Sequence, residues 1–152
     1  MKKTLAILLS AVMMLGLLAG CGSKTTEQPS TSGTENTETA ALNVGVFYYD
    51  YSDVYISSVR SSMDEQLKAM GVNYTNYDGG SNQAQQTDQI NTAISNGANL
   101  LIVNMVTSGS PDVANEIISL ANGTPVIFFN RAIEADGEEG TVLNANANIC
   151  FI

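Results

Sequence analysis

Five short segments of strand character alternate with stretches of helical character along most of this chain. Four of them are apolar and suit buried strands, at residues 42–49, 99–105, 124–129 and 148–152, whereas the second in chain order, 72–77, is shorter and more polar. Between the first four of the five segments, apolar residues recur at helical spacing within 54–70, 83–96 and 113–120. Strands that alternate with helices indicate βαβ units and a mostly parallel sheet. We therefore expect an α/β fold, a doubly wound open parallel sheet with helices on both faces.

The N-terminal part of the chain has a different character and divides into two segments before the domain at 42–152. Two lysines and an apolar run are followed by Leu18-Ala19-Gly20-Cys21, which resembles a bacterial lipobox. The apolar run is shorter than the roughly 20 residues of a spanning helix. Residues 1–21 are thus predicted to form a lipoprotein signal peptide with Cys21 as the acylated residue. The alternatives are a plain signal peptide with an incidental cysteine, or a membrane helix. Residues 22–41, rich in Thr, Ser, Glu and Gly, suit a flexible tether.

Composition excludes several classes of function. The formal net charge is -9, so binding to nucleic acid is not expected. The chain has no histidine, which removes the usual general base and the usual zinc ligand. The sequence contains neither a GxGxxG fingerprint nor a phosphate-binding P-loop motif. Cys150 lies in an apolar strand and is expected to be a buried, unreactive thiol without a disulfide partner.

Polar residues follow each predicted strand. In open parallel sheets, ligands bind beyond the carboxyl ends of the strands, which here means residues 50–55, 78–82, 104–108 and 130–131. The first of these loops contains the carboxylates of Asp50 and Asp53, which would repel a phosphate group. An ionised carboxylate accepts hydrogen bonds only, so this loop suits a ligand with hydroxyl donors, such as a sugar.

Three stretches carry a specific resemblance: VGVFYYDYSDVYISSVRSSM, SNQAQQTDQINTAISNGANLLIVNMV and TPVIFFNR. Together they resemble the N-terminal half of the galactose/glucose- and ribose-binding receptors of ABC importers, which have the type I periplasmic binding protein fold. The resemblance covers residues 43–152 and is nearest to the galactose/glucose branch. It implies a ligand held between two lobes joined by a hinge, of which this chain has the N-terminal one. We expect a fragment that binds sugar very weakly by itself. No cofactor is expected, since the calcium site of some members lies in the other half.

The resemblance also implies roles for individual residues. Asp53 matches an aspartate that accepts hydrogen bonds from sugar hydroxyls, and Tyr55 matches an aromatic residue that packs on the sugar ring. Asn104 matches an asparagine that bonds a hydroxyl from the other side. Asn130 and Arg131 lie at the same edge and are expected to be supporting or interlobe groups. The structural alternatives are an N-cap for Asp53, packing for Tyr55 and a loop cap for Asn104. The nearby residues Tyr48, Tyr49 and Tyr51 are expected in the core or at the rim.

These features favour a non-enzymatic, lipid-anchored receptor that captures a galactose- or glucose-type sugar for an ABC importer. Its expected partners are a monosaccharide and a membrane permease, and its expected location is outside the bacterial cell membrane. A sensory lipoprotein that hands a sugar or signal molecule to a membrane receptor kinase is the alternative. An enzyme is disfavoured, because the sequence shows no nucleophile-base pair and no phosphate loop.

Overall fold

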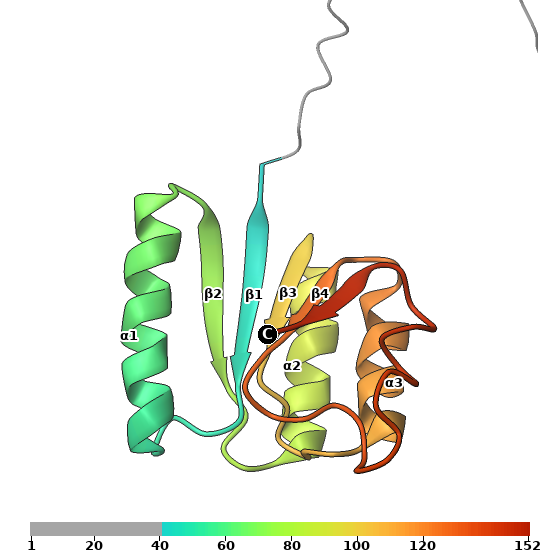
Figure 1. The fold of residues 1–152 in the computed structure, drawn as a ribbon. Helices are drawn as coiled ribbons and strands as arrows, with labels where there is room; N and C mark the ends of the chain where they lie inside the picture. The colour runs from blue at the N-terminus through green and yellow to red at the C-terminus, as the bar shows by residue number, and fades with distance from the viewer. Residues whose placement is uncertain (1–40) are drawn as a thin grey trace, which may run out of the picture. The chain divides into compact units, whose positions relative to one another are not determined.

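The computed structural model describes residues 41–152. Cys21, the signal segment 1–21 and nearly all of the tether 22–41 lie outside the described residues. The described part contains a five-stranded parallel sheet with the order β2-β1-β3-β4-β5 (Figure 1). The strands are β1 (Asn43–Tyr48), β2 (Asn73–Asp78), β3 (Leu100–Val103), β4 (Val126–Phe128) and β5 (Ile149–Phe151). Each expected strand is present. β2 has the predicted length, shifted by one residue, and the other strands are two or three residues shorter than the segments that predict them.

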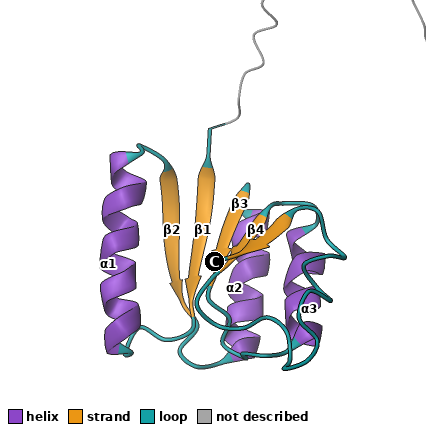
Figure 2. Ribbon diagram, in the orientation of Figure 1, coloured by secondary structure: helices purple, strands orange, loops and turns teal. Residues whose placement is uncertain are grey.

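Three helices cover the two faces of this sheet. Helix α1 (Val54–Ala69) packs on one face, and α2 (Gln83–Ser95) and α3 (Pro111–Ala121) pack on the other (Figures 1 and 2). Neighbouring strands are parallel throughout, which requires crossover connections of this kind. The expected doubly wound α/β fold is therefore confirmed.

The side chains of β1 alternate between two separate apolar cores. Val44, Val46 and Tyr48 face α1 and pack with its buried residue Ile56. Phe47 points to the opposite face and packs with residues of α2, α3 and the central strands. Burial on both faces explains why β1 and β3 read as nearly continuous apolar runs rather than as alternating ones.

Each helix begins with a polar cap directly after a strand and its short loop. The side chains of Asp53, Asn82 and Ser110 accept hydrogen bonds from backbone N–H groups in the first turns of α1, α2 and α3. These side chains satisfy N–H groups that a helix leaves without partners. Because the strands are parallel, all three caps lie at the edge of the sheet where the strands end.

Cys150 corrects one expectation. It lies in β5 as predicted, but its side chain is exposed rather than buried. β5 is the last strand of the sheet, and Cys150 pairs with Ile127, whose side chain belongs to the face that α1 covers. Helix α1 lies at the other end of the sheet, beside β1 and β2 (Figure 1). An apolar strand sequence therefore does not guarantee burial when the strand lies at an edge.

Candidate functional site

The loops at the carboxyl ends of the strands are tied to one another by hydrogen bonds. Asp78, at the end of β2, accepts a bond from the backbone N–H of Tyr51 at 3.0 Å. The hydroxyl of Ser81 donates to the carboxylate of Asp50 at 2.5 Å. These bonds join the loop after β1 to the loop after β2, and they fix the shape of this edge.

The glutamines at the start of α2 brace the same loops, a role that the sequence did not reveal. Gln86 is completely buried; its amide N–H donates to the carbonyl of Asn104 at 2.9 Å, and its oxygen accepts from the N–H of Val106 at 3.0 Å. Two further glutamines donate to the carbonyl of Asp78, and another accepts from the loop after β3: Gln85, Gln89 and Gln83 respectively. Each amide fills backbone bonding positions that a loop cannot fill by itself.

Asp53 has both of its carboxylate oxygens placed by neighbours. One oxygen, Oδ1, caps α1 by accepting from the N–H of Ile56 at 2.9 Å. The other, Oδ2, accepts from the hydroxyl of Tyr49 at 2.5 Å. The bond from Tyr49, helped by the backbone bond from Ile56, lowers the pKa of Asp53 below its ordinary value. Asp53 is thus an N-cap and also a charged acceptor at the rim, since its side chain is only half-buried.

Tyr49 brings three of the predicted site residues together. Its hydroxyl donates to Asp53, and its backbone N–H donates to Oδ1 of Asn104 at 3.2 Å. The guanidinium of Arg131 lies over its ring, 4.3 Å from the centroid. Sequence reasoning placed Tyr49 in the core or at the rim and missed this role. Its four-residue spacing from the cap residue is the one signal that could have indicated it.

Asn104 is fully buried, and both ends of its side chain bond to backbone groups. Its Nδ2 donates to the carbonyl of Phe129 at 3.1 Å, while Oδ1 accepts from Tyr49. The side chain therefore joins the end of β3 to the ends of β1 and β4, which is the loop-cap alternative. A direct contact between Asn104 and a ligand stays a prediction.

Tyr55 and Asn130 are accessible at this edge. Tyr55, on the first turn of α1 and two residues beyond Asp53, is 60% exposed. Its ring is free to pack against a bound molecule. Asn130 is exposed in the left-handed backbone region, with φ at 65°, and its N–H donates to the carbonyl of Ile152 at 3.1 Å. The backbone of Asn130 thus extends the pairing of β4 with the end of the chain.

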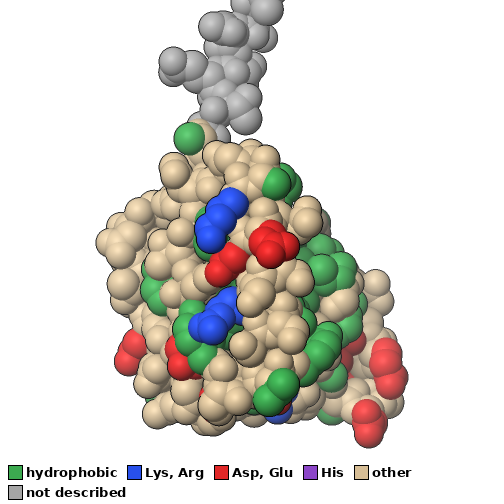
Figure 3. All heavy atoms as spheres, turned by 90° about the vertical axis from the view of Figure 1, so that its left-hand side faces the viewer, with side chains coloured by type: hydrophobic (Ala, Val, Ile, Leu, Met, Phe, Trp, Pro, Cys, Tyr) green, Lys and Arg blue, Asp and Glu red, His purple; other side chains and the backbone are tan. Residues whose placement is uncertain are grey.

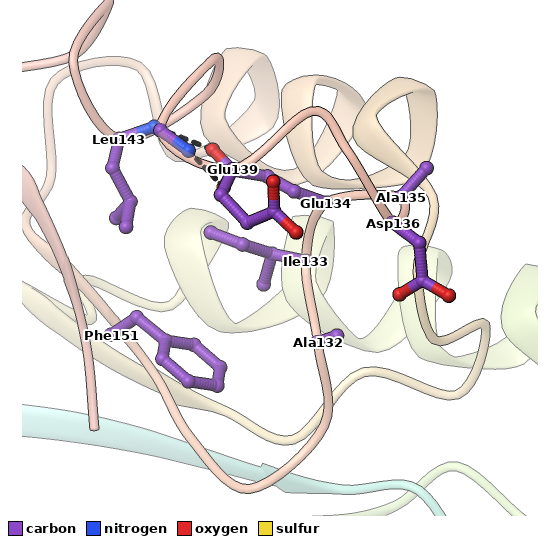
Figure 4. A pocket seen from close by; sticks show the side chains of 9 residues that line it. Ala132, Ile133, Glu134, Ala135, Asp136, Glu139, Leu143 and Phe151 are labelled. Atoms are coloured by element: carbon purple, nitrogen blue, oxygen red, sulfur yellow. Dashed lines mark hydrogen bonds between the residues drawn. The ribbon is translucent and has the colours of Figure 1, made fainter.

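A cavity of about 320 Å³ lies beside this edge, under the segment that follows β4. Its lining includes Ile133, Leu143 and Phe151, whose side chains converge on it in Figure 4. The carboxylate of Glu134 turns into the loop, where it accepts three backbone bonds, from Gly140 at 2.5 Å, Val142 at 2.6 Å and Leu143 at 3.1 Å. This cavity is lined by neither Asp53 nor Tyr55, so it is a separate feature.

Charged side chains are few on the face that α1 presents. Figure 3 shows basic and acidic groups there, scattered among uncharged side chains. One of the basic residues of α1, Arg60, lies over the ring of Tyr51, 3.9 Å from its centroid. Among residues 41–152, no three metal-ligating side chains gather into a group. No helix in this part of the chain is long and apolar enough to cross a membrane.

Comparison with known proteins assigns this chain to a family. Residues 44–148 match the model of the periplasmic binding protein domain. The chain belongs to this family. The resemblance inferred from the sequence is therefore confirmed at the level of family and fold, and a periplasmic binding protein acts outside the cytoplasmic membrane.

Two curated relatives extend the comparison. The D-galactose/methyl-galactoside binding periplasmic protein MglB of Haemophilus influenzae is 33% identical over 103 residues, which are 65% of this chain and 30% of the relative. The ribose import binding protein RbsB of Bacillus subtilis is 25% identical over 148 residues, which are 96% of this chain and 46% of the relative. The chain thus spans less than half the length of these relatives. Both are named as binding proteins rather than as enzymes.

Solved structures share the fold. A solute-binding protein of an ABC transporter from Clostridium phytofermentans, with bound β-D-glucose, is 27% identical with a TM-score of 0.53; the match covers 62% of this chain and 29% of that one. A complex of the TorS sensor domain with TorT contains a chain that is 26% identical with a TM-score of 0.56, over 66% of this chain and 34% of that one.

Proposed function

We propose that this chain supplies the N-terminal lobe of a sugar-binding receptor for an ABC importer, with a ligand of the galactose or glucose type. The observation that carries the proposal is the carboxylate of Asp53, fixed at the carboxyl edge of the sheet two residues before the exposed ring of Tyr55. The ligands of MglB and of the glucose-bound structure support the choice of ligand.

The chemistry of these two side chains matches a sugar. A carboxylate has about four acceptor positions, and Asp53 uses two of them for Tyr49 and Ile56. The remaining positions suit the hydroxyl groups of a neutral polyol, and such charge-assisted bonds are stronger than neutral ones. An aromatic ring that packs against the C–H face of a sugar is expected to add about 0.5–1.5 kcal/mol to the binding free energy, the same scale as a pair of aromatic side chains.

The receptor would act by capture and closure rather than by bond-making chemistry. Sites that bind small molecules tightly bury most of the ligand surface. We propose that a second lobe covers the Asp53 edge, and that closure around the sugar is the signal that a membrane permease reads. In this proposal Cys21 is lipidated and residues 22–41 tether the domain to the outer surface of the cell membrane.

A sensory role is the second candidate, and one observation favours it. The matched chain of the TorS–TorT complex belongs to an assembly with a sensor domain. A lobe of the same fold could therefore pass its ligand state to a receptor kinase instead of a permease. Co-purification with the permease from its own membrane supports the importer; co-purification with a sensor kinase supports the alternative.

Amide NMR of the full chain, in a detergent without a sugar headgroup, tests the binding surface. We expect galactose or glucose at millimolar concentration to shift the signals of residues 49–56, and ribose to shift them less. Weak affinity is expected, because this surface alone leaves much of the sugar exposed. Signals that stay unchanged up to the solubility of all three sugars would contradict the proposal.

A further inference from the structure

The hydroxyl of Tyr49 holds Asp53 in a single orientation. Carboxylates at protein surfaces rotate readily unless bonds fix them, and Asp53 is fixed at both oxygens, by the backbone at Oδ1 and by Tyr49 at Oδ2. The hydroxyl-to-carboxylate distance of 2.5 Å is that of a charge-assisted bond. Only the outward positions of the carboxylate are left for a ligand.

Tyr49 is itself held from three sides. Its backbone N–H bonds to the buried side chain of Asn104, and its ring lies under the guanidinium of Arg131. Arg131 is fixed in turn, because its Nη1 donates to the carbonyl of Val106 at 2.8 Å and to that of Met105 at 3.3 Å. Residues that follow β3 and β4 thus hold the backbone and the ring of Tyr49, the residue that follows β1.

A cation over this ring also affects the bond to Asp53. The positive guanidinium of Arg131 is attracted to the negative face of the Tyr49 ring, which is a cation–π interaction. It makes the phenol hydroxyl a better donor, while the nearby carboxylate of Asp53 raises the pKa of Tyr49 and keeps its proton in place. The negative charge of Asp50 raises the pKa of Asp53 and so opposes the bond from Tyr49, which lowers that pKa.

We infer that Tyr49, seated under Arg131, is a positioning residue for ligand recognition: it presets the Asp53 carboxylate to receive ligand hydroxyls. The inference rests on the proposed function, because the ligand is taken to be a sugar. Arg131 then raises the affinity for the sugar by holding the ring of Tyr49, without touching the sugar itself.

Substitutions at two residues, each with a matched control, test the inference in the full chain. Tyr49→Phe removes the hydroxyl and keeps the ring. Its control is Tyr77→Phe, because Tyr77 is also a tyrosine but stacks on Phe47, on the face of the sheet that α2 covers. Arg131→Met removes the cation, Arg131→Lys keeps a charge, and Arg60→Met, which removes the cation over Tyr51, is the second control.

The pKa of Asp53 is measured by carboxyl NMR, and the sugar dissociation constant by amide shifts with galactose and glucose. For Tyr49→Phe we expect the pKa of Asp53 to rise toward its ordinary value. We expect the dissociation constant to increase about 3- to 10-fold, the net scale of one ordinary hydrogen bond, because Asp53 keeps its charge and its bond to Ile56. For Arg131→Met we expect an increase of about 2- to 5-fold, the scale of an exposed cation–π pair, with a smaller increase for Arg131→Lys. The two controls should change neither quantity.

The outcomes separate this inference from the proposed function. A Tyr49→Phe chain that binds sugar as the unsubstituted chain does, or that leaves the pKa of Asp53 unchanged, would overturn the inference alone. An unsubstituted chain that responds to no sugar would contradict the proposed function and the inference with it. Matching thermal unfolding of all variants excludes a general loss of structure.

Discussion

Two carboxylates near the carboxyl edge of the sheet, Asp53 and Glu134, accept hydrogen bonds from different kinds of donor. Glu134 directs both oxygens into its own loop, where they accept three backbone bonds. Asp53 accepts one bond from a backbone N–H and one from the phenol of Tyr49. The exposed ring of Tyr55 follows it two residues later. Glu134 thus holds its own loop, whereas the remaining acceptor positions of Asp53 are the ones that we propose for a ligand.

The same difference appears in the pKa values. Partial burial would raise the pKa of Glu134, yet the bonds from Gly140, Leu143 and Val142 outweigh it and lower the pKa. The pKa of Asp53 is lowered first by the side chain of Tyr49. Both groups stay ionised near neutral pH, but only Asp53 owes its low pKa chiefly to a side chain, that of Tyr49 in the same loop.

The largest expected effect separates the two residues by ligand binding. Asp53→Asn removes the charge that strengthens bonds from sugar hydroxyls, and it turns half of the acceptor group into a donor. We expect the dissociation constant for galactose or glucose to rise at least about tenfold, the scale of hydrogen bonds to charged groups. Amide NMR titration measures it, and Glu134→Gln is the matched control, with binding expected within about twofold of the unsubstituted chain. Equal losses in both variants would abolish the distinction.

The reverse effect should appear in the loop that Glu134 closes. Glu134→Gln weakens the bonds to the N–H groups of Gly140, Val142 and Leu143. We expect hydrogen exchange at these amides to accelerate roughly tenfold, because local opening loses charge-assisted bonds. Asp53→Asn should leave these amides unchanged and expose the first turn of α1 instead. Unchanged exchange in Glu134→Gln would show that the loop is held by other contacts.

Most of the fold followed from the sequence because strands and helices leave local patterns. Asp53, Asn82 and Ser110 each precede a helical pattern and each caps it in the structure. The exposure of Cys150 could not be predicted, since it depends on which strand lies at the edge and on where α1 packs. Val54 continues the apolar pattern of α1 yet is 83% exposed, whereas Ile56 on the same turn is fully buried.

The site was only partly predictable, for a related reason. Position after the first strand predicts that Asp53 and Tyr55 lie at the ligand edge, and the family resemblance supplies their roles, which stay predictions. The role of Gln86 depends on a bond to Asn104, and Tyr49 is held by Asn104 and Arg131, all of them far away in the sequence. Local sequence patterns do not mark such distant partners, and only the four-residue spacing between Tyr49 and Asp53 is a local signal.

Tyr55 gives a smaller expected effect that sharpens the ligand side of the comparison. Tyr55→Ala removes the ring beside Asp53, and we expect the sugar dissociation constant to rise between about 2- and 10-fold, the scale of an aromatic contact. Tyr55→Phe keeps the ring and should bind within about twofold. A loss for Tyr55→Phe as large as that for Tyr55→Ala would show that the hydroxyl, not the ring face, contacts the ligand.

The smallest expected effect is on stability at acidic pH. The folded-state pKa values of Asp53 and Glu134 lie below their ordinary values of 3.8 and 4.5. Each group therefore stabilises the fold fully above its ordinary value, and this contribution is lost as pH falls through the folded-state pKa. Urea unfolding between about pH 6 and pH 3 should show falling stability, with a shallower fall in Glu134→Gln than in the unsubstituted chain. An equally steep fall would mean that other carboxylates carry the effect.

The most direct test of the proposed sugar-binding edge is an intermolecular nuclear Overhauser measurement between the full chain and galactose or glucose. We predict transfer from the ring protons of Tyr55 to the C–H protons of the sugar, since that ring is exposed beside Asp53. Transfer to the side chains of Ile133 and Phe151 instead would place the ligand in the cavity under the loop of Glu134 and contradict the account.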